Sequence, residues 1–103
     1  LRAALRIAGR ARRAGLDVFV TSGLDGAVGR AAALHLAAAL PGRLPACGLA
    51  TARLLDEDLA PPQEVVDGHL PLPKGPGLGV VPDPAALSRL ASGPTLEFGE
   101  GGS

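Results

Sequence analysis

The side chains that could act as a nucleophile and its base in this sequence are one cysteine and two histidines. Cys47 could attack a substrate with His35 or His69 as the base, but the histidines lie in unrelated segments and no third residue orients either one. We therefore interpret Cys47 as a buried structural thiol. Ser22 does not fit the G-x-S-x-G pattern of a hydrolase nucleophile, because neither position 20 nor position 24 is glycine.

Metal and phosphate sites are also incomplete. Asp56, Glu57 and Asp58 could bind a divalent cation, but three consecutive acids on a helix point in different directions, which favours a solvated surface. His35 has no second ligand three or four residues away, so we interpret it as an ordinary helix histidine. The glycine-rich segment 75–79 follows prolines and lacks the Lys-Ser/Thr ending of a phosphate loop, which indicates backbone turns.

The composition is that of one domain-sized unit with a thin core. Of the 103 residues, 47% are hydrophobic but only 2% are aromatic. Ten basic and ten acidic residues give a formal net charge of zero, which predicts no bulk attraction to nucleic acid or to an anionic membrane. The single cysteine suits a reducing cytoplasm, and the longest apolar stretch, 31–40, is too short to span a bilayer. Because the first residue is not Met, we expect the true N-terminus to lie upstream.

Helical periodicity marks two segments in the first forty residues. Residues 1–14 place apolar side chains on one side and five arginines on the other, which predicts an amphipathic helix with a solvated basic face. Gly15 stands where a glycine would end that helix. A second, alanine-rich helix is predicted over 27–40, preceded by a capping-box pattern at Ser22 and Asp25.

Two short apolar runs, at 16–21 and 44–48, predict strands that are buried on both faces. The first fifty residues are therefore expected to alternate between helix and strand, as in an α/β layer with parallel strands. Further along we expect a helix at 51–59, a hairpin at 64–72 around an Asp-Gly turn, a helix at 84–91 and disorder at the C-terminal end.

Two small loops are the best candidates for a binding site. Ser22 and Gly23 follow the first expected strand, and Gly48 follows the second. In α/β folds, ligands bind at the carboxyl ends of parallel strands, where small residues let a substrate approach the backbone. The alternative is that these glycines serve only the turns.

Four sequence blocks in a fixed order resemble a known family. They are VFVTSGLDGAVGRAA at 18–32, LPACGLAT at 44–51, DGHLPLP at 67–73 and GPGLGV at 75–80. Together they are similar to the carboxyl-terminal third of the o-succinylbenzoate synthase family of the enolase superfamily, over about residues 1–90. The second block is typical of the synthases, whereas the last is shared with muconate-cycloisomerase-like relatives and N-acylamino acid racemases.

The resemblance implies an α/β fold, namely the C-terminal part of a modified TIM barrel from its sixth helix to its eighth. Residues 1–60 would belong to the barrel, and 61–92 would form a hairpin and a tail that packs on an α+β capping domain. Residues 93–103 would form a disordered tail. The implied partners are the remainder of the chain's own barrel and its capping domain.

The resemblance also implies a lyase reaction in menaquinone biosynthesis. With Mg²⁺ and two lysines, the family dehydrates 2-succinyl-6-hydroxycyclohexadiene-1-carboxylate, a small-molecule carboxylate, to o-succinylbenzoate. The family's metal-binding acids and its lysines precede Leu1, so no catalytic and no metal-binding residue can be carried over to this chain. Substrate contacts are implied for Ser22, Gly23 and Gly48, whose positions line the pocket in relatives.

Departures from the family pattern leave alternatives open. Asp25, Gly26 and Ala27 stand where the family more often has Glu followed by small hydroxyl residues, and Ala50 replaces a common glycine. An N-acylamino acid racemase or a cycloisomerase of the same superfamily is therefore the alternative enzyme. From another class, the alternative is a catalytically inactive fragment that acts as an interaction module.

Overall fold

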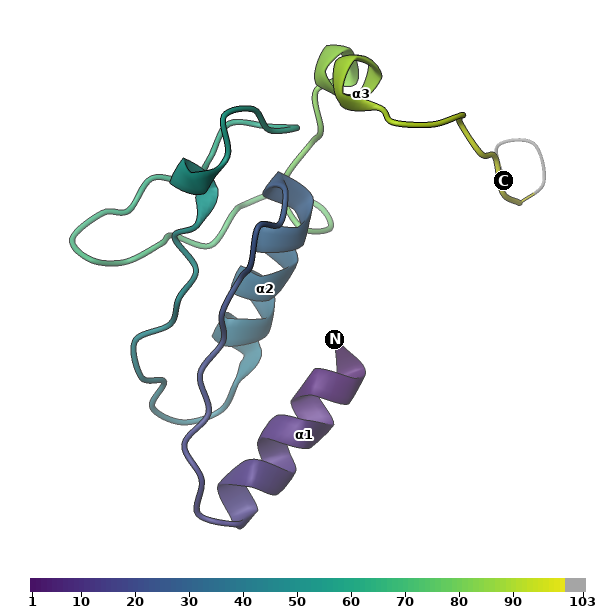
Figure 1. The fold of residues 1–103 in the computed structure, drawn as a ribbon. Helices are drawn as coiled ribbons and strands as arrows, with labels where there is room; N and C mark the ends of the chain where they lie inside the picture. Colours follow the sequence, from purple (N-terminus) through teal and green to yellow (C-terminus); the bar gives the residue numbers. More distant parts are fainter. Residues whose placement is uncertain (100–103) are drawn as a thin grey trace.

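The computed structural model describes residues 1–99, and three α-helices lie in that range. They are α1 (Arg2–Arg13), α2 (Ala27–Ala39) and α3 (Pro84–Leu90), with one 3-10 turn, η1 (Ala52–Leu54), between the last two. Each α-helix falls inside a segment that the sequence pattern predicts to be helical. Residues 16–26 run back from the end of α1 to the start of α2, and α3 lies beyond the N-terminal end of α2 (Figure 1). None of these helices is long and apolar enough to cross a membrane.

α1 is an amphipathic helix that ends as its sequence predicts. Ala8 is buried, and the arginines on the opposite side are exposed apart from the half-buried Arg12. Gly15 adopts a φ of 77°, which only glycine reaches without strain. The amide of Gly15 then donates to the carbonyl of Arg12 (3.0 Å), and the amide of Leu16 donates to the carbonyl of Ala11 (2.9 Å). These two bonds satisfy carbonyls that the helix end would otherwise leave without partners.

α2 forms because alanine is the best helix former, and it starts where it is predicted to, but its N-terminal cap differs from the prediction. The helix begins at Ala27, and its N-cap residue is Gly26, which has no side chain to offer. The expected capping box is wrong, because the carboxylate of Asp25 accepts a hydrogen bond from the amide of Gly23 (3.0 Å) instead of from the helix. The amide of Ala27 donates to the carboxylate of Asp58, a residue 31 positions away (2.8 Å).

The two expected strands are reduced to a single point of pairing. Thr21 and Gly48 form an isolated parallel bridge. The part of the chain that the structure describes contains isolated bridges but no extended strand. The amide of Gly48 donates to the carbonyl of Val20 (3.1 Å), and the amide of Ser22 donates to the carbonyl of Gly48 (2.9 Å). The parallel direction is confirmed. Strands over 16–21 and 44–48 are not, because a strand needs a continuing ladder of backbone bonds and these segments share only two.

The second half of the chain is mostly loop. A hairpin bridge joins Val66 to His69, and its two turn residues, Asp67 and Gly68, have φ values of 49° and 74°. Two positive φ values are those of the turn that an Asp-Gly pair favours, so the predicted hairpin is confirmed in short form. The helix expected at 51–59 is wrong beyond the three residues of η1. Residues 93–99 contain no helix or strand, and the rest of the predicted disordered tail, 100–103, lies outside the described residues.

The core is small and built from short side chains. Leu34, Ala37 and Leu49 form its buried centre, against which Val20 and Leu70 are packed. No large side chain between residues 1 and 99 is fully buried, and Ile7 and Phe19 are 67% and 61% exposed. The radius of gyration is 15.9 Å, against about 13 Å for a compact domain of this length. Much of the apolar surface therefore has no cover within this segment.

We expect residues 1–103 in isolation to lack a cooperative thermal transition and to bind an apolar dye, because so much apolar surface is exposed. Differential scanning calorimetry and dye fluorescence measure both properties. A sharp heat-capacity peak without dye binding would show that the small core is sufficient.

Candidate functional site

The structure brings together the two loops that the sequence singles out. Ser22 and Gly48 are adjacent because of the parallel bridge, although 26 positions separate them along the chain. The hydroxyl of Ser22 donates to the carbonyl of Gly48 over a long 3.3 Å. Ser22 is half-buried and Gly48 is exposed, so a small ligand can reach both.

Gly23 and Gly48 differ in the space that a side chain would have at each position. A Cβ at position 48 would lie 3.2 Å from Cγ2 of Thr21, which is tighter than ordinary contact. A Cβ at position 23 would meet nothing within 4 Å. The bridge itself thus favours glycine at 48, whereas the contacts within this segment give no packing reason for glycine at 23. Gly23 is exposed, and its amide is already bonded to Asp25.

Thr51 is a site residue that sequence reasoning missed. Its hydroxyl lies 2.8 Å from the hydroxyl of Ser22, a short hydrogen bond in which either can donate. If Thr51 donates, Ser22 keeps its own proton for another acceptor, and the one it uses here is the weakly held carbonyl of Gly48. The sequence signal for Thr51 is only that a hydroxyl residue stands three positions after Gly48; the bridge between Thr21 and Gly48 is what brings it beside Ser22.

A buried ion pair lies at the C-terminal end of the loop that carries Ser22, next to Asp25. Arg30 on α2 and Asp58 lie 2.6 Å apart, and their side chains are only 9% and 13% exposed. The second arm of the Arg30 guanidinium donates to the carbonyl of Asp25 (2.8 Å). Asp58 was expected to sit on a solvated acidic surface; Asp56 and Glu57 do, but Asp58 does not. Adjacent acids point in different directions, and here one of them faces α2.

Several donors stabilise the ionised form of Asp58. Burial raises the pKa of Asp58, but the amide of Ala27, the side chain and charge of Arg30 and the amide of Leu59 together outweigh it. The pKa of this carboxyl therefore lies below its ordinary value of 3.8. A carboxylate at the N-terminal end of α2 also interacts favourably with the helix dipole.

The cysteine and the histidines are engaged locally and do not form a catalytic group. Cys47 is half-buried beside the core, where its sulfur accepts from the amide of Val20 (3.3 Å). His35 bonds the carbonyl of Leu78 through Nε2 (2.8 Å), as expected of an ordinary helix histidine. His69 is exposed and bonds the carbonyl of Asp67 (2.8 Å).

The glycine-rich segment 75–79 serves the backbone, as predicted. Gly75, Gly77 and Gly79 all have positive φ values, and a Cβ on Gly79 would lie 2.8 Å from the carbonyl oxygen of Lys74. This turn carries the carbonyl of Leu78 to His35. Its glycines are thus explained by chain geometry, without a phosphate ligand.

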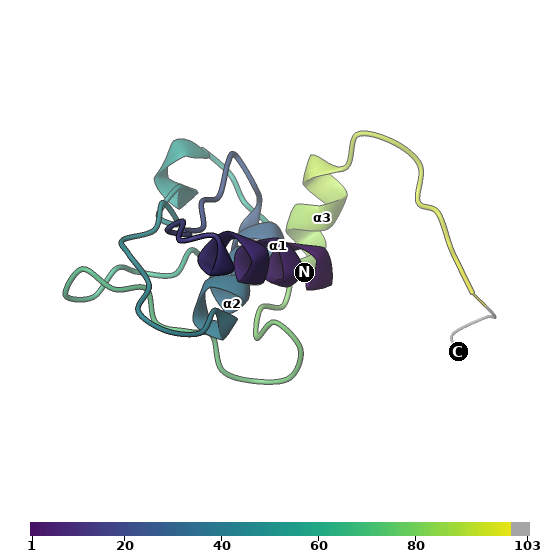
Figure 2. The same cartoon turned by 90° about the horizontal axis from the view of Figure 1, so that it is seen from below.

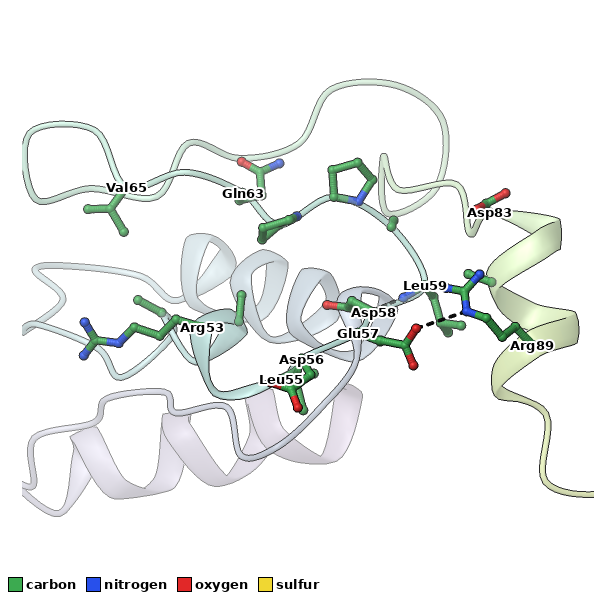
Figure 3. A pocket seen from close by; sticks show the side chains of 16 residues that line it. Arg53, Leu55, Asp56, Glu57, Asp58, Leu59, Gln63, Val65, Asp83 and Arg89 are labelled. Atoms are coloured by element: carbon green, nitrogen blue, oxygen red, sulfur yellow. Dashed lines mark hydrogen bonds and ion pairs between the residues drawn. The ribbon is translucent and has the colours of Figure 1, made fainter.

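A large cleft lies apart from the predicted loops. Its volume is about 660 Å³, and it opens between the 50–65 segment and α3, where Glu57 and Arg89 form an exposed ion pair (3.1 Å) (Figure 3). Ser22, Gly23 and Gly48 do not line it. It contains acidic side chains, but no three His, Cys, Asp or Glu residues within 1–99 gather in a way that could hold a metal ion.

Comparison with known proteins identifies the family of this segment. A family model described as enolase C-terminal domain-like matches residues 1–86. The chain belongs to this family. The parallel direction of the bridge between Thr21 and Gly48 is consistent with an α/β fold of this family. No solved structure matches the chain.

Proteins named o-succinylbenzoate synthase are similar to most of the chain. The one from Mycobacterium tuberculosis strain H37Rv is 46% identical over 84 residues, which are 82% of this chain and 24% of the relative. The Mycobacterium marinum and Mycobacterium leprae proteins are 48% and 49% identical over 79 residues, or 77% of this chain and 23% and 22% of theirs. The chain thus spans about a quarter of the length of the curated relatives it matches.

The lowered pKa of Asp58 predicts an acid-dependent contribution to stability. Because the folded form has the lower pKa, the contribution is complete above the unfolded value of about 3.8 and is lost as pH falls through the folded value. We expect Asp58→Asn to lower the urea-denaturation midpoint of the protein that carries this segment at pH 7, with a smaller difference from wild type below pH 4. Glu57→Gln, at an exposed neighbour, is the matched control and should show no such trend.

Proposed function

We propose that this chain is the C-terminal part of an o-succinylbenzoate synthase, a lyase that dehydrates 2-succinyl-6-hydroxycyclohexadiene-1-carboxylate in menaquinone biosynthesis. The main support is the 46–49% identity to three proteins of that name over at least 77% of the chain. The proposal assigns Mg²⁺ and the proton-transfer residues to parts of the protein outside this segment. It places the enzyme in the cytoplasm, where a lone thiol such as Cys47 stays reduced.

In this proposal Ser22, Gly23 and Gly48 form part of the wall of the substrate pocket. The hydroxyl of Ser22 can turn from the carbonyl of Gly48 to a substrate carboxylate and gives up only a 3.3 Å bond. A hydrogen bond to a charged oxygen is stronger than the one that it replaces. A Cβ at position 23 would meet nothing within 4 Å, so the absence of a side chain there leaves the backbone open to a ring-sized substrate, and Gly48 is exposed beside it.

The exposed apolar surface is consistent with a segment that completes a larger barrel. A cleft of about 300 Å³ between α1 and α2 is lined almost entirely by apolar side chains, and it includes the largely exposed Phe19. We propose that the remainder of the barrel covers this surface. Residues 1–60 would then form the barrel portion, and 61–92 would lead to the capping domain; the segment that follows α3 extends away from the three helices (Figure 2).

The test is a substrate panel on the full-length protein that carries this segment. We expect dehydration to o-succinylbenzoate that requires added Mg²⁺, monitored by ultraviolet absorbance. Racemisation of N-acylamino acids without dehydration would favour the alternative enzyme of the superfamily. Full-length protein that folds and turns over neither class of substrate would support the inactive interaction module instead.

Ser22→Ala tests the substrate contact within the same assay. We expect the KM for the carboxylate substrate to rise by about tenfold, the loss expected for one hydrogen bond to a charged group. Ser88→Ala, which removes an exposed hydroxyl on α3, is the matched control and should leave KM unchanged. An unchanged KM in Ser22→Ala would remove Ser22 from the site.

A further inference from the structure

We propose that Arg30 and Asp58 are positioning residues, which hold the loop at residues 22–26 in the shape that presents Ser22 and Gly23 to the substrate. The substrate part of this inference rests on the proposed function. The loop itself, called the site loop below, lies between the bridge at Thr21 and the first residue of α2. Neither Arg30 nor Asp58 is placed in contact with substrate, so any effect on binding would be transmitted through the loop.

Arg30 connects the site loop to the segment around Asp58. One arm of its guanidinium donates to the carbonyl of Asp25, in the site loop, and the other pairs with Asp58. A planar guanidinium makes two directed bonds at once, whereas a lysine ammonium on a flexible stem cannot reproduce that fork. The single side chain of Arg30 therefore fixes the loop relative to the segment around Asp58.

Asp58 pairs with Arg30 through Oδ2 and uses its other carboxylate oxygen, Oδ1, to bond the backbone. Oδ1 accepts from the amide of Ala27 (2.8 Å), the first residue of α2, and from the amide of Leu59 (2.7 Å). The carboxylate thus binds the end of the site loop and the start of the helix to its own segment. Both charged groups are largely removed from water, so solvent competes weakly for these bonds.

The bond from the amide of Gly23 to the carboxylate of Asp25 lies within the site loop and does not fix the loop relative to the rest of the chain, so the loop needs further support. It contains two glycines, Gly23 and Gly26, and the side chain of Leu24 is 72% exposed. At its first residue, Ser22 is held by Gly48 and Thr51. At the other end the loop is held by Arg30 through the carbonyl of Asp25. Release of the second attachment would let glycine-rich backbone sample many conformations while the bridge stays intact.

Two variants separate positioning from simple stabilisation. Arg30→Lys keeps the charge opposite Asp58 but cannot also donate to Asp25, and Asp58→Asn keeps an acceptor for Ala27 but removes the charge partner of Arg30. The matched control is Arg89→Gln, which breaks the nearby ion pair with Glu57. Both side chains of that pair are more than half exposed, and both residues lie outside the site loop. All are made in the full-length protein.

The first measurement is hydrogen exchange of the amides in the site loop and at the start of α2. We expect exchange there to quicken by about tenfold in Arg30→Lys and Asp58→Asn, as for loss of a charge-assisted hydrogen bond. Exchange in α1 should be unchanged, and Arg89→Gln should match wild type. Unchanged exchange of the site loop in both variants would overturn the inference, whatever the protein's activity proves to be.

The second measurement is the division of the effect between KM and kcat for the dehydration substrate. We expect Arg30→Lys to raise KM by about tenfold with kcat within about twofold of wild type, because binding is weakened and the chemistry lies elsewhere. A lower melting temperature with unchanged KM would show a purely structural role and would also overturn the inference. Lack of dehydration by wild type, in contrast, would refute the proposed function and leave the exchange result to decide the loop.

Discussion

The carboxylate of Asp58 lies where three parts of the chain meet, namely the site loop, the start of α2 and the segment that follows η1. It bonds the first amide of the helix, pairs with Arg30 and, through Arg30, holds the carbonyl of Asp25. A helix that begins after a glycine has no side-chain cap of its own, so this distant carboxylate satisfies a donor that would otherwise remain unpaired. In our proposal, the shape of the loop that carries Ser22 and Gly23 depends on this carboxylate.

This polar connection matters because the apolar core contributes little rigidity. Leu34, Ala37 and Leu49 are short or medium side chains, and alanine removes little area from water when it is buried. Larger residues such as Ile7 and Phe19 are mostly exposed. The proposal that the remainder of a barrel covers this surface rests on that exposure and on the fact that the chain spans about a quarter of the length of the relatives it matches.

The site combines one backbone contact and two side-chain contacts of different strength. The bridge between Thr21 and Gly48 decides which loops are neighbours, and close packing at Thr21 favours glycine at position 48. The short bond to Thr51 then orients the hydroxyl of Ser22, while the bond to the carbonyl of Gly48 is long enough to be exchanged. An ordered hydroxyl with a replaceable acceptor is suited to recognise a carboxylate.

The sequence by itself determined the three α-helices, the end of α1 at Gly15, the Asp-Gly hairpin and the closeness of Ser22 to Gly48. The helices, the helix end and the hairpin follow from periodicity and from glycine's access to positive φ, which are local, whereas the closeness of Ser22 to Gly48 follows from the expected parallel direction of two apolar segments. Tertiary structure alone decided that the strands shrink to one bridge, that Thr51 joins Ser22, and that Asp58 rather than Asp25 meets the first amide of α2. A carboxylate bonds whichever donor the fold brings within reach, and residues 31 positions apart leave no periodic trace of that meeting in the sequence.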